Sequence, residues 1–179
     1  MTALATTLVL GGARSGKSAF AEKLVRDSGL VRIYLATATA GDGEMQVRIA
    51  RHRVQRGDDW ITIEEPLALV DALTREPHHG RAVLVDCLTL WLSNLMLAER
   101  DPDVEVRRLT RFLGVASYPL VLVSNEVGLG LVPDTPLGRQ FRDAQGRLNQ
   151  TIAACVPNVA FIAAGLPLWL KQSSLQENQ

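Results

Sequence analysis

The fold is decided by the stretch Gly11-Gly12-Ala13-Arg14-Ser15-Gly16-Lys17-Ser18, which matches the pattern G-x-x-x-x-G-K-[ST]. Glycines let the backbone curl so that successive N–H groups point inward at an anion. Lys17 can neutralise the outer phosphates of a bound nucleotide, and the Ser18 hydroxyl can bind Mg²⁺. The stretch therefore predicts a loop that binds the phosphates of a nucleotide.

The residues on either side of this loop have the pattern that such a loop requires. Thr6 to Leu10 is typical of a buried strand, and Lys17 to Asp27 has the apolar spacing of a helix. The electropositive N-terminus of that helix adds to the attraction for phosphate. A chance match in a glycine-rich loop is the alternative, and it does not explain the strand–loop–helix context.

Apolar strand candidates alternate with helix candidates along the rest of the chain. This rhythm predicts an α/β fold with a mostly parallel sheet and helices on both faces, and the phosphate loop makes it one of the P-loop NTPase type. We expect one catalytic domain over residues 1–171 and a polar tail over residues 172–179. The other expected strands are Val31–Ala36, Trp60–Ile63, Ala82–Val85, Leu120–Ser124 and Val159–Ala163. The other expected helices are Glu44–Arg56, Leu67–Thr74, Leu88–Glu99, Val104–Val115 and Leu137–Ala154.

Composition limits the classes of protein to which the chain can belong. Its 179 residues are enough for about one domain, and 19 basic residues balance 19 acidic ones, which argues against a nucleic-acid partner. Cys87 and Cys155 lie in apolar segments without metal-ligand spacing, as expected for free thiols in a reducing compartment. The apolar stretch Val156 to Leu170 is broken by prolines and is shorter than the ~20 residues of a membrane helix. We therefore expect no membrane span and a cytoplasmic location.

An acidic residue follows the strand expected at Ala82–Val85. Asp86 stands where a carboxylate can hold Mg²⁺ opposite a phosphate loop. Four apolar residues followed by an acid also occur wherever a strand leaves a core, so this assignment depends on the phosphate loop. Ligands of open α/β sheets bind beyond the carboxyl ends of the strands. The sequence therefore predicts Ser18 and Asp86 as the metal ligands.

The expected helix Glu44–Arg56 carries a cluster of cations around one histidine. Arg48, His52 and Arg56 lie four residues apart on one face, and Arg51 and Arg53 lie to the sides. Cations on both sides disfavour protonation of the imidazole. The lone pair of the neutral ring then stays available, so that the histidine can act as a nucleophile. Arginines can also hold phosphate oxygens bidentately. A solvent-facing basic helix or a small RNA-binding patch is the alternative explanation.

Polar residues in three further segments follow expected strands. Thr37-Ala38-Thr39 offers hydroxyls that can reach a base or a ribose, and a simple turn is the alternative. Glu64 and Glu65 can contact a ribose or act as a base, or they are ordinary first-turn residues of the next helix. The segment 125–133 is rich in glycine, and by itself it indicates only a flexible loop.

Four motifs occur together between about Leu8 and Ala164: GGARSGKS, the helix EMxxRIxxHxxxR, the strand that ends before Cys87, and SNEVGLGLVP followed by FRDAQGRLNQ. In this combination they resemble the bifunctional adenosylcobinamide kinase / adenosylcobinamide-phosphate guanylyltransferase family of cobalamin biosynthesis. The phosphate loop is shared by many families, whereas the histidine helix and the last motif are much more specific. The resemblance implies a RecA-like fold and a homotrimer with the active site near the subunit boundary.

The resemblance also implies two reactions at one nucleotide site. ATP or GTP gives its γ-phosphoryl group to the aminopropanol hydroxyl of adenosylcobinamide, a corrinoid, with Lys17, Mg²⁺ and Asp86 stabilising the transferred group. His52 then attacks the α-phosphorus of GTP, and the GMP passes to adenosylcobinamide phosphate, which gives adenosyl-GDP-cobinamide. The phosphate-loop contacts are Gly11, Gly12, Ala13, Arg14, Ser15, Gly16, Lys17 and Ser18, and by family position they are joined by Thr37, Ala38, Thr39, Arg53, Val54, Gln55, Arg56, Glu64 and Asp86.

The chain departs from some relatives at two positions, and two other functions stay open. Arg51 stands where some relatives have a second histidine, and Asp86 stands where some have glutamate. One alternative is a kinase of another small hydroxyl compound, in which His52 only binds phosphate. The other is a nucleotide-dependent switch or motor subunit, although the chain has no Asn-Lys-x-Asp motif for reading a guanine base.

Overall fold

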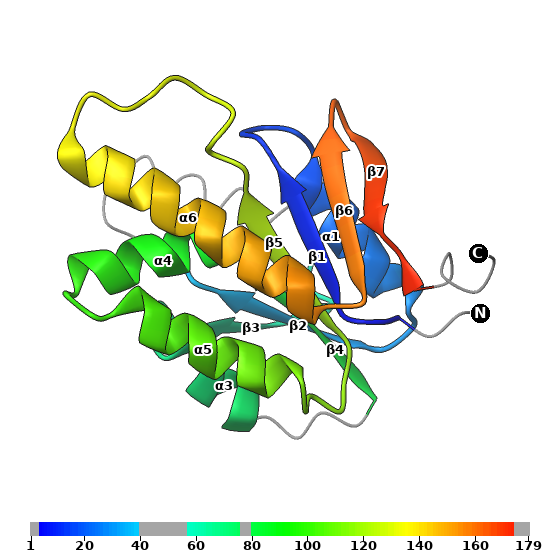
Figure 1. Cartoon of the computed structure of the whole chain (residues 1–179). Coiled ribbons are helices and arrows are strands. Elements are labelled where there is room, and N and C mark those ends of the chain that lie inside the picture. The colour runs from blue at the N-terminus through cyan, green and yellow to red at the C-terminus, as the bar shows by residue number, and fades with distance from the viewer. Residues whose placement is uncertain (1–3, 40–56, 76–79, 174–179) are drawn as a thin grey trace.

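The computed structural model describes residues 4–39, 57–75 and 80–173. Its centre is a seven-stranded sheet in the order β3-β2-β4-β5-β1-β6-β7 (Figure 1). All strand pairs are parallel except β6 with β7, so the predicted mostly parallel α/β sheet is confirmed. The strands are β1 (Thr7–Gly11), β2 (Val31–Ala36), β3 (Trp60–Glu64), β4 (Arg81–Asp86), β5 (Leu120–Asn125), β6 (Asn158–Ala163) and β7 (Leu166–Lys171).

Helices cover both faces of this sheet, as the sequence predicts (Figure 1). One face carries α1 (Lys17–Asp27), which packs against β1, β4 and β5. The opposite face carries the other described helices, whose apolar residues share one core cluster. These helices are α3 (Leu69–Arg75), α4 (Leu88–Leu97), α5 (Pro102–Leu113) and α6 (Pro136–Cys155).

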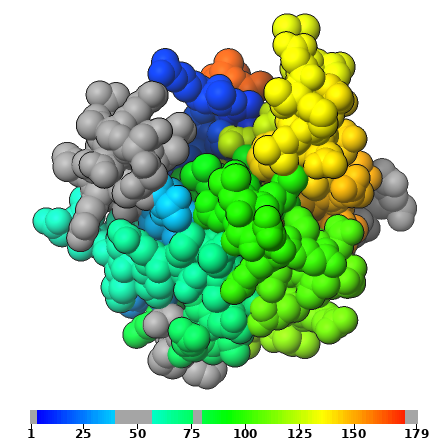
Figure 2. Space-filling view, turned by 90° about the vertical axis from the view of Figure 1, so that its left-hand side faces the viewer, coloured from blue at the N-terminus to red at the C-terminus, as the bar shows by residue number. Residues whose placement is uncertain are grey.

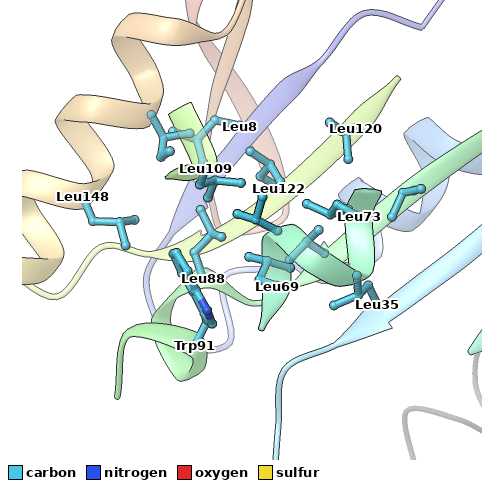
Figure 3. Packing of buried hydrophobic residues seen from close by; sticks show 14 of the residues in the cluster. Leu8, Leu35, Leu69, Leu73, Leu88, Trp91, Leu109, Leu120, Leu122 and Leu148 are labelled. Atoms are coloured by element: carbon cyan, nitrogen blue, oxygen red, sulfur yellow. The ribbon is translucent and has the colours of Figure 1, made fainter. Parts of the chain in front are cut away.

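Alternation of side chains along the strands divides the core into two layers. In β1, Leu8 and Leu10 belong to the layer beneath α3 to α6, whereas Val9 belongs to the layer beneath α1. Figure 3 shows Leu8 of this strand in the same packed cluster as Trp91 of α4 and Leu148 of α6. Because the central strands are buried on both faces, they appear in the sequence as continuous apolar runs. This is why their positions could be predicted.

Capping residues determine where two of the helices begin. The Asp101 side chain accepts hydrogen bonds from two backbone N–H groups of α5, and the Thr135 hydroxyl accepts one from α6. A proline follows each cap, where its fixed φ suits the first helical position. The helices therefore begin at Pro102 and Pro136, slightly earlier than the apolar spacing indicated.

β7 is a strand that the sequence analysis did not predict. The prolines between Val156 and Leu170 indicated only an interrupted apolar stretch, yet Leu166–Lys171 pairs antiparallel with β6. Pro167 is tolerated because β7 lies at the edge of the sheet, where part of the backbone needs no partner. The two strands are joined by Ala164 and Gly165, whose φ angles of 51° and 79° are those of a tight hairpin turn.

Candidate nucleotide-binding site

The phosphate loop lies between the end of β1 and the start of α1, as predicted. Gly16 is the N-cap residue of α1 with φ 94°, and no side chain among the described residues caps the first turn of the helix. The Gly12 carbonyl accepts hydrogen bonds from the Ser15 N–H at 3.3 Å and from the Lys17 Nζ at 3.0 Å. The uncapped helix N-terminus and the ammonium group together form a site suited to an anion.

Close contacts explain why this loop needs glycine at two positions. A Cβ at Gly11 would lie 2.5 Å from the Ser15 Oγ and 2.7 Å from the Ile162 carbonyl oxygen. A Cβ at Gly16 would lie 3.1 Å from the Cα of Gly165 in the hairpin turn between β6 and β7. The Ser15 Oγ is buried and has no hydrogen-bond partner in the described part of the chain. The backbone groups of Ser15 are bonded within the protein, since its N–H donates to the Gly12 carbonyl and its carbonyl accepts from the Gly165 N–H.

Asp86 lies at the end of β4, on the same face of the sheet as α1. Leu84 of this strand packs in the layer beneath α1, and alternation places Asp86 on that side as well. The Tyr34 hydroxyl donates a hydrogen bond to Asp86 Oδ2 at 3.1 Å. Asp86 is the last residue of β4, and Gly11 is the last residue of β1. Only β5 lies between these two strands, so both residues lie at the carboxyl end of the sheet, two strands apart. The sequence did not indicate Tyr34, because its partner lies 52 residues away.

The chemistry of Ser18 and Asp86 fits the Mg²⁺ ion predicted for them. Both offer oxygen, and Mg²⁺ is usually bound by one or two carboxylates together with substrate phosphates and water. Within the described ranges, no group of three or more His, Cys, Asp or Glu could hold a metal ion.

Thr37 is fully buried, and its hydroxyl is used within the protein. The hydroxyl donates to the Cys87 carbonyl at 2.7 Å and accepts from the Cys87 N–H at 2.9 Å. Asn94 of α4 donates to the Thr37 carbonyl at 2.8 Å. These bonds tie the ends of β2 and β4 together next to Asp86. Ala38 and Thr39 follow at the same edge, and the Thr39 side chain is exposed.

The two glutamates after the third strand have different surroundings. Glu64 is the last residue of β3, and its side chain is exposed. The Oε1 of Glu65 accepts hydrogen bonds from the N–H groups of Leu67 at 3.0 Å and Ala68 at 2.8 Å. Glu65 is therefore a capping residue ahead of α3, which agrees with the expectation that an acidic residue here belongs to the start of the next helix.

The pKa of the Cys87 thiol is shifted by burial and by charged groups near the end of β4. Burial raises the pKa of the Cys87 thiol to about 11, and the adjacent Asp86 carboxylate contributes to the rise. Backbone N–H groups at the start of α4 and the Lys17 ammonium lower the same pKa. The end of β4 therefore lies within electrostatic range of the lysine of the phosphate loop.

The remaining predicted residues lie at the surface or outside the described ranges. Ala13 and Arg14 are exposed in the phosphate loop, and Arg14 has φ 55°. In Figure 2 the blue N-terminal part of the chain lies beside the yellow segment that follows β5. The predicted helix Glu44–Arg56 is outside the described residues, and so are His52, Arg53, Val54, Gln55 and Arg56.

Solved structures of low sequence identity have the same fold as this chain. The chain is similar to the flagellar accessory protein FlaH from Methanocaldococcus jannaschii, with a TM-score of 0.56 and 11% identity over 95% of this chain and 79% of that one. It is also similar to the RadB recombinase, with a TM-score of 0.51 and 16% identity over 88% of this chain and 73% of that one. At these identities the likeness shows the fold alone, which is RecA-like.

Relatives of higher identity and a family model show the family. The chain is 53% identical over 171 residues to the bifunctional adenosylcobalamin biosynthesis protein CobP of Pseudomonas aeruginosa, which covers 94% of this chain and 98% of that protein. It is 37% identical over 179 residues to the bifunctional adenosylcobalamin biosynthesis protein CobU of Escherichia coli K12, which covers 92% of this chain and 98% of that protein. The model of the CobU family, cobinamide kinase / cobinamide phosphate guanyltransferase, matches residues 7–170. The motifs, the sheet order and these relatives agree, and the chain belongs to the cobinamide kinase / cobinamide phosphate guanyltransferase family.

Proposed function

We propose that the phosphate loop and Asp86 bind the nucleoside triphosphate whose γ-phosphoryl group is transferred to adenosylcobinamide. The observation that carries this proposal is that the loop, the uncapped N-terminus of α1 and Asp86 share one end and one face of the sheet. Lys17 neutralises charge on the outer phosphates, and the N–H groups of the loop orient them. Ser18 and Asp86 would hold a Mg²⁺ ion, which would supply further neutralisation of the phosphate charge.

The phosphoryl transfer needs little covalent chemistry from the protein. The hydroxyl oxygen of the acceptor forms a bond to the γ-phosphorus, while the bond from that phosphorus to the bridging oxygen breaks. The nucleoside diphosphate leaves with the electron pair of the broken bond, and the proton of the acceptor hydroxyl is released to water. Positioning and charge stabilisation are therefore the main contributions of the site.

We propose His52 as the nucleophile of the guanylyl transfer, on the basis of its arginine-rich sequence context and of the family. A ring nitrogen bonds to the α-phosphorus of GTP, and pyrophosphate leaves with the electrons of the broken bond. A phosphate oxygen of adenosylcobinamide phosphate then displaces the imidazole, which gives adenosyl-GDP-cobinamide. Splitting the exchange in this way replaces one difficult step by two easier ones.

The proposal includes a nucleotide contact by Glu64 and Thr39, a single domain over residues 1–171, a cytoplasmic location and a homotrimer. β7 supports contact between copies, because Leu166, Leu168 and Leu170 on this edge strand are 72%, 61% and 59% exposed. In the described ranges no helix has the length and apolar character of a membrane span. Sedimentation velocity tests the homotrimer, and a monomer at working concentration contradicts it.

Labelling with GTP that carries radioactive phosphorus at the α-position tests the proposed function. We expect an acid-labile, base-stable label on the wild type, and mass spectrometry should locate a GMP adduct within residues 44–56. His52→Ala should remove the label and spare much of the phosphorylation of adenosylcobinamide, whereas Lys17→Ala should impair both reactions. Intact GTP binding without any label would leave the kinase of another hydroxyl compound as the better assignment.

A further inference from the structure

A buried cluster of polar side chains joins α6 to the end of β5. It consists of Ser124, Gln145 and Asn149, which are 0%, 0% and 5% exposed, and we call it the β5–α6 polar cluster. Gln145 Nε2 donates to Ser124 Oγ at 2.9 Å and to Asn149 Oδ1 at 3.0 Å. The Ser124 hydroxyl donates to Asn149 Oδ1 at 2.7 Å. The three side chains therefore constrain one another within the core.

Stability does not explain why this cluster is polar. Gln145 Oε1 is buried and has no hydrogen-bond partner within residues 4–39, 57–75 and 80–173. A buried acceptor without a partner destabilises the folded state, and an apolar group of similar shape avoids that cost. Natural proteins keep such costs mainly at functional sites. The position of the cluster in the fold shows which site it serves.

The cluster holds the last residue of β5 against the phosphate loop. Asn149 Nδ2 donates to the carbonyl of Asn125 at 3.1 Å, and the N–H of Asn125 donates to Thr89 Oγ1 at 2.7 Å. Both backbone polar groups of Asn125 are thus bonded to side chains of neighbouring helices. The next residue, Glu126, donates its N–H to the carbonyl of Gly11 at 3.0 Å. The end of β5 is therefore fixed on one side by α4 and α6 and on the other by the first residue of the phosphate loop.

The side chain of Asn125 lies on the face of the sheet where the nucleotide site is. Val121 and Val123 of the same strand pack in the layer beneath α1, and alternation places Asn125 on that side. In the parallel register Asn125 is the partner of Gly11 in β1. Its carboxamide is half-buried and makes no hydrogen bond within the described residues. A hydrogen-bonding group that has no partner in the described part of the chain is thus held beside the phosphate loop.

We propose that Gln145 and Asn149 are positioning residues for the phosphoryl transfer, which they serve by aligning the Asn125 carboxamide with the terminal phosphate of the nucleotide. This inference rests on the proposed function of the phosphate loop. The internal bonds of the loop, from Ser15 and Lys17 to Gly12, involve no residue of the cluster. Loss of the cluster should therefore slow the transfer much more than it weakens nucleotide binding.

Gln145→Met tests the inference, because methionine has a similar shape and lacks the amide. We expect kcat for phosphorylation of adenosylcobinamide to fall about tenfold or more, since correct alignment of a polar group at a transition state has effects of that order. The nucleotide Kd should change less than about threefold, and Tm should stay the same or rise. Gln150→Met is the matched control, because Gln150 is an exposed residue of the same helix, and we expect no change in kcat.

Asn125→Ala is the second variant. Because Asn125 is only half-buried, this variant should fold, and it tests the inference even if Gln145→Met fails to fold. Asn125→Ala should lower kcat at least as much as Gln145→Met, and the double variant should be no slower than Asn125→Ala alone. Unchanged kcat in either single variant, or additive losses in the double variant, would overturn the inference. A wild-type protein that does not phosphorylate adenosylcobinamide would instead overturn the proposed function itself.

Discussion

The backbone N–H of Gly165 donates to the carbonyl oxygen of Ser15 over 2.8 Å, which joins the hairpin turn after β6 to the middle of the phosphate loop. β6 is also hydrogen-bonded along β1, the strand from which the loop leaves the sheet. The hairpin at the edge of the sheet is therefore part of the scaffold of the nucleotide site. Substitutions in this turn should therefore change nucleotide binding at the phosphate loop.

Gly165→Ala should destabilise the fold and weaken nucleotide binding together. Gly165 has φ +79°, and an added Cβ would meet nothing within 4 Å, so the cost is backbone strain and not a clash. We expect the free energy of unfolding in urea to fall by about 1–2 kcal/mol. The nucleotide Kd should rise several-fold because the turn supports the loop.

Gly29→Ala is the control for this effect. Gly29 has φ +70° and the same open surroundings, but it lies beyond the other end of α1. The loss of stability should be similar, and the nucleotide Kd should stay the same. Equal changes of Kd in the two variants would show that the Gly165 turn has no special link to the loop.

Gly11→Ala should abolish nucleotide binding, because the new methyl group would collide with the backbone. Its Cβ would lie 2.7 Å from the Ile162 carbonyl, which belongs to β6, a strand paired on both sides that cannot yield easily. Gly12→Ala differs, since a Cβ there would meet nothing within 4 Å. Thermal unfolding should show a clear loss of Tm for Gly11→Ala and little change for Gly12→Ala. Equal Tm values would contradict the steric argument.

Thr37→Val should act mainly on stability. The substitution keeps the shape of the side chain but removes the hydroxyl that bonds both the N–H and the carbonyl of Cys87. The Cys87 N–H would be left without a partner among the described residues, at a cost of roughly 1–3 kcal/mol of the free energy of unfolding, whereas the Cys87 carbonyl still accepts from the Trp91 N–H at 3.2 Å. Thr37→Ser keeps the hydroxyl and should retain most of the stability in urea unfolding. A stable Thr37→Val protein that has lost nucleotide affinity would mean that the hydroxyl contacts the ligand instead.

The Cys87 thiol should make stability fall at alkaline pH. Burial, aided by the Asp86 carboxylate, raises the pKa of Cys87 in the folded protein to about 11, whereas an unfolded cysteine has a pKa of ~8.5. The folded state therefore holds this proton more tightly than the unfolded state. The resulting stabilisation is fully present below about pH 8.5 and is lost as the pH rises to about 11.

Urea unfolding between pH 8 and 11 checks this expectation. Over this range the Cys87 thiol should lower the free energy of unfolding by an amount on the order of 2–3 kcal/mol. Cys87→Ala should flatten the pH dependence relative to the wild type. Cys155→Ala should not, because Cys155 is exposed. Parallel pH profiles for the wild type and Cys87→Ala would contradict the raised pKa.

Local patterns were enough to predict most of the fold. The central strands are long apolar runs, and the loop after β1 carries a motif whose residue types are each required by phosphate binding. β7 could not be found in this way, because its exposed Leu166, Leu168 and Leu170 and its Pro167 lack the appearance of a buried strand. Glu65 could not be separated from Glu64, since both roles use the same residue type, and only the position of α3 distinguishes them.

By itself, the sequence determined the phosphate loop, the parallel α/β architecture and the family, because these depend on residues that are close together in the chain. The tertiary structure alone decided which polar side chains serve one another. Thr37 meets Cys87 from 50 residues away, and Gln145 meets Ser124 from 21 residues away. Such contacts depend on the order of the strands and on how the helices pack over them. Neither is encoded in any short stretch, since each polar group finds its partner only after the apolar core has brought distant segments together.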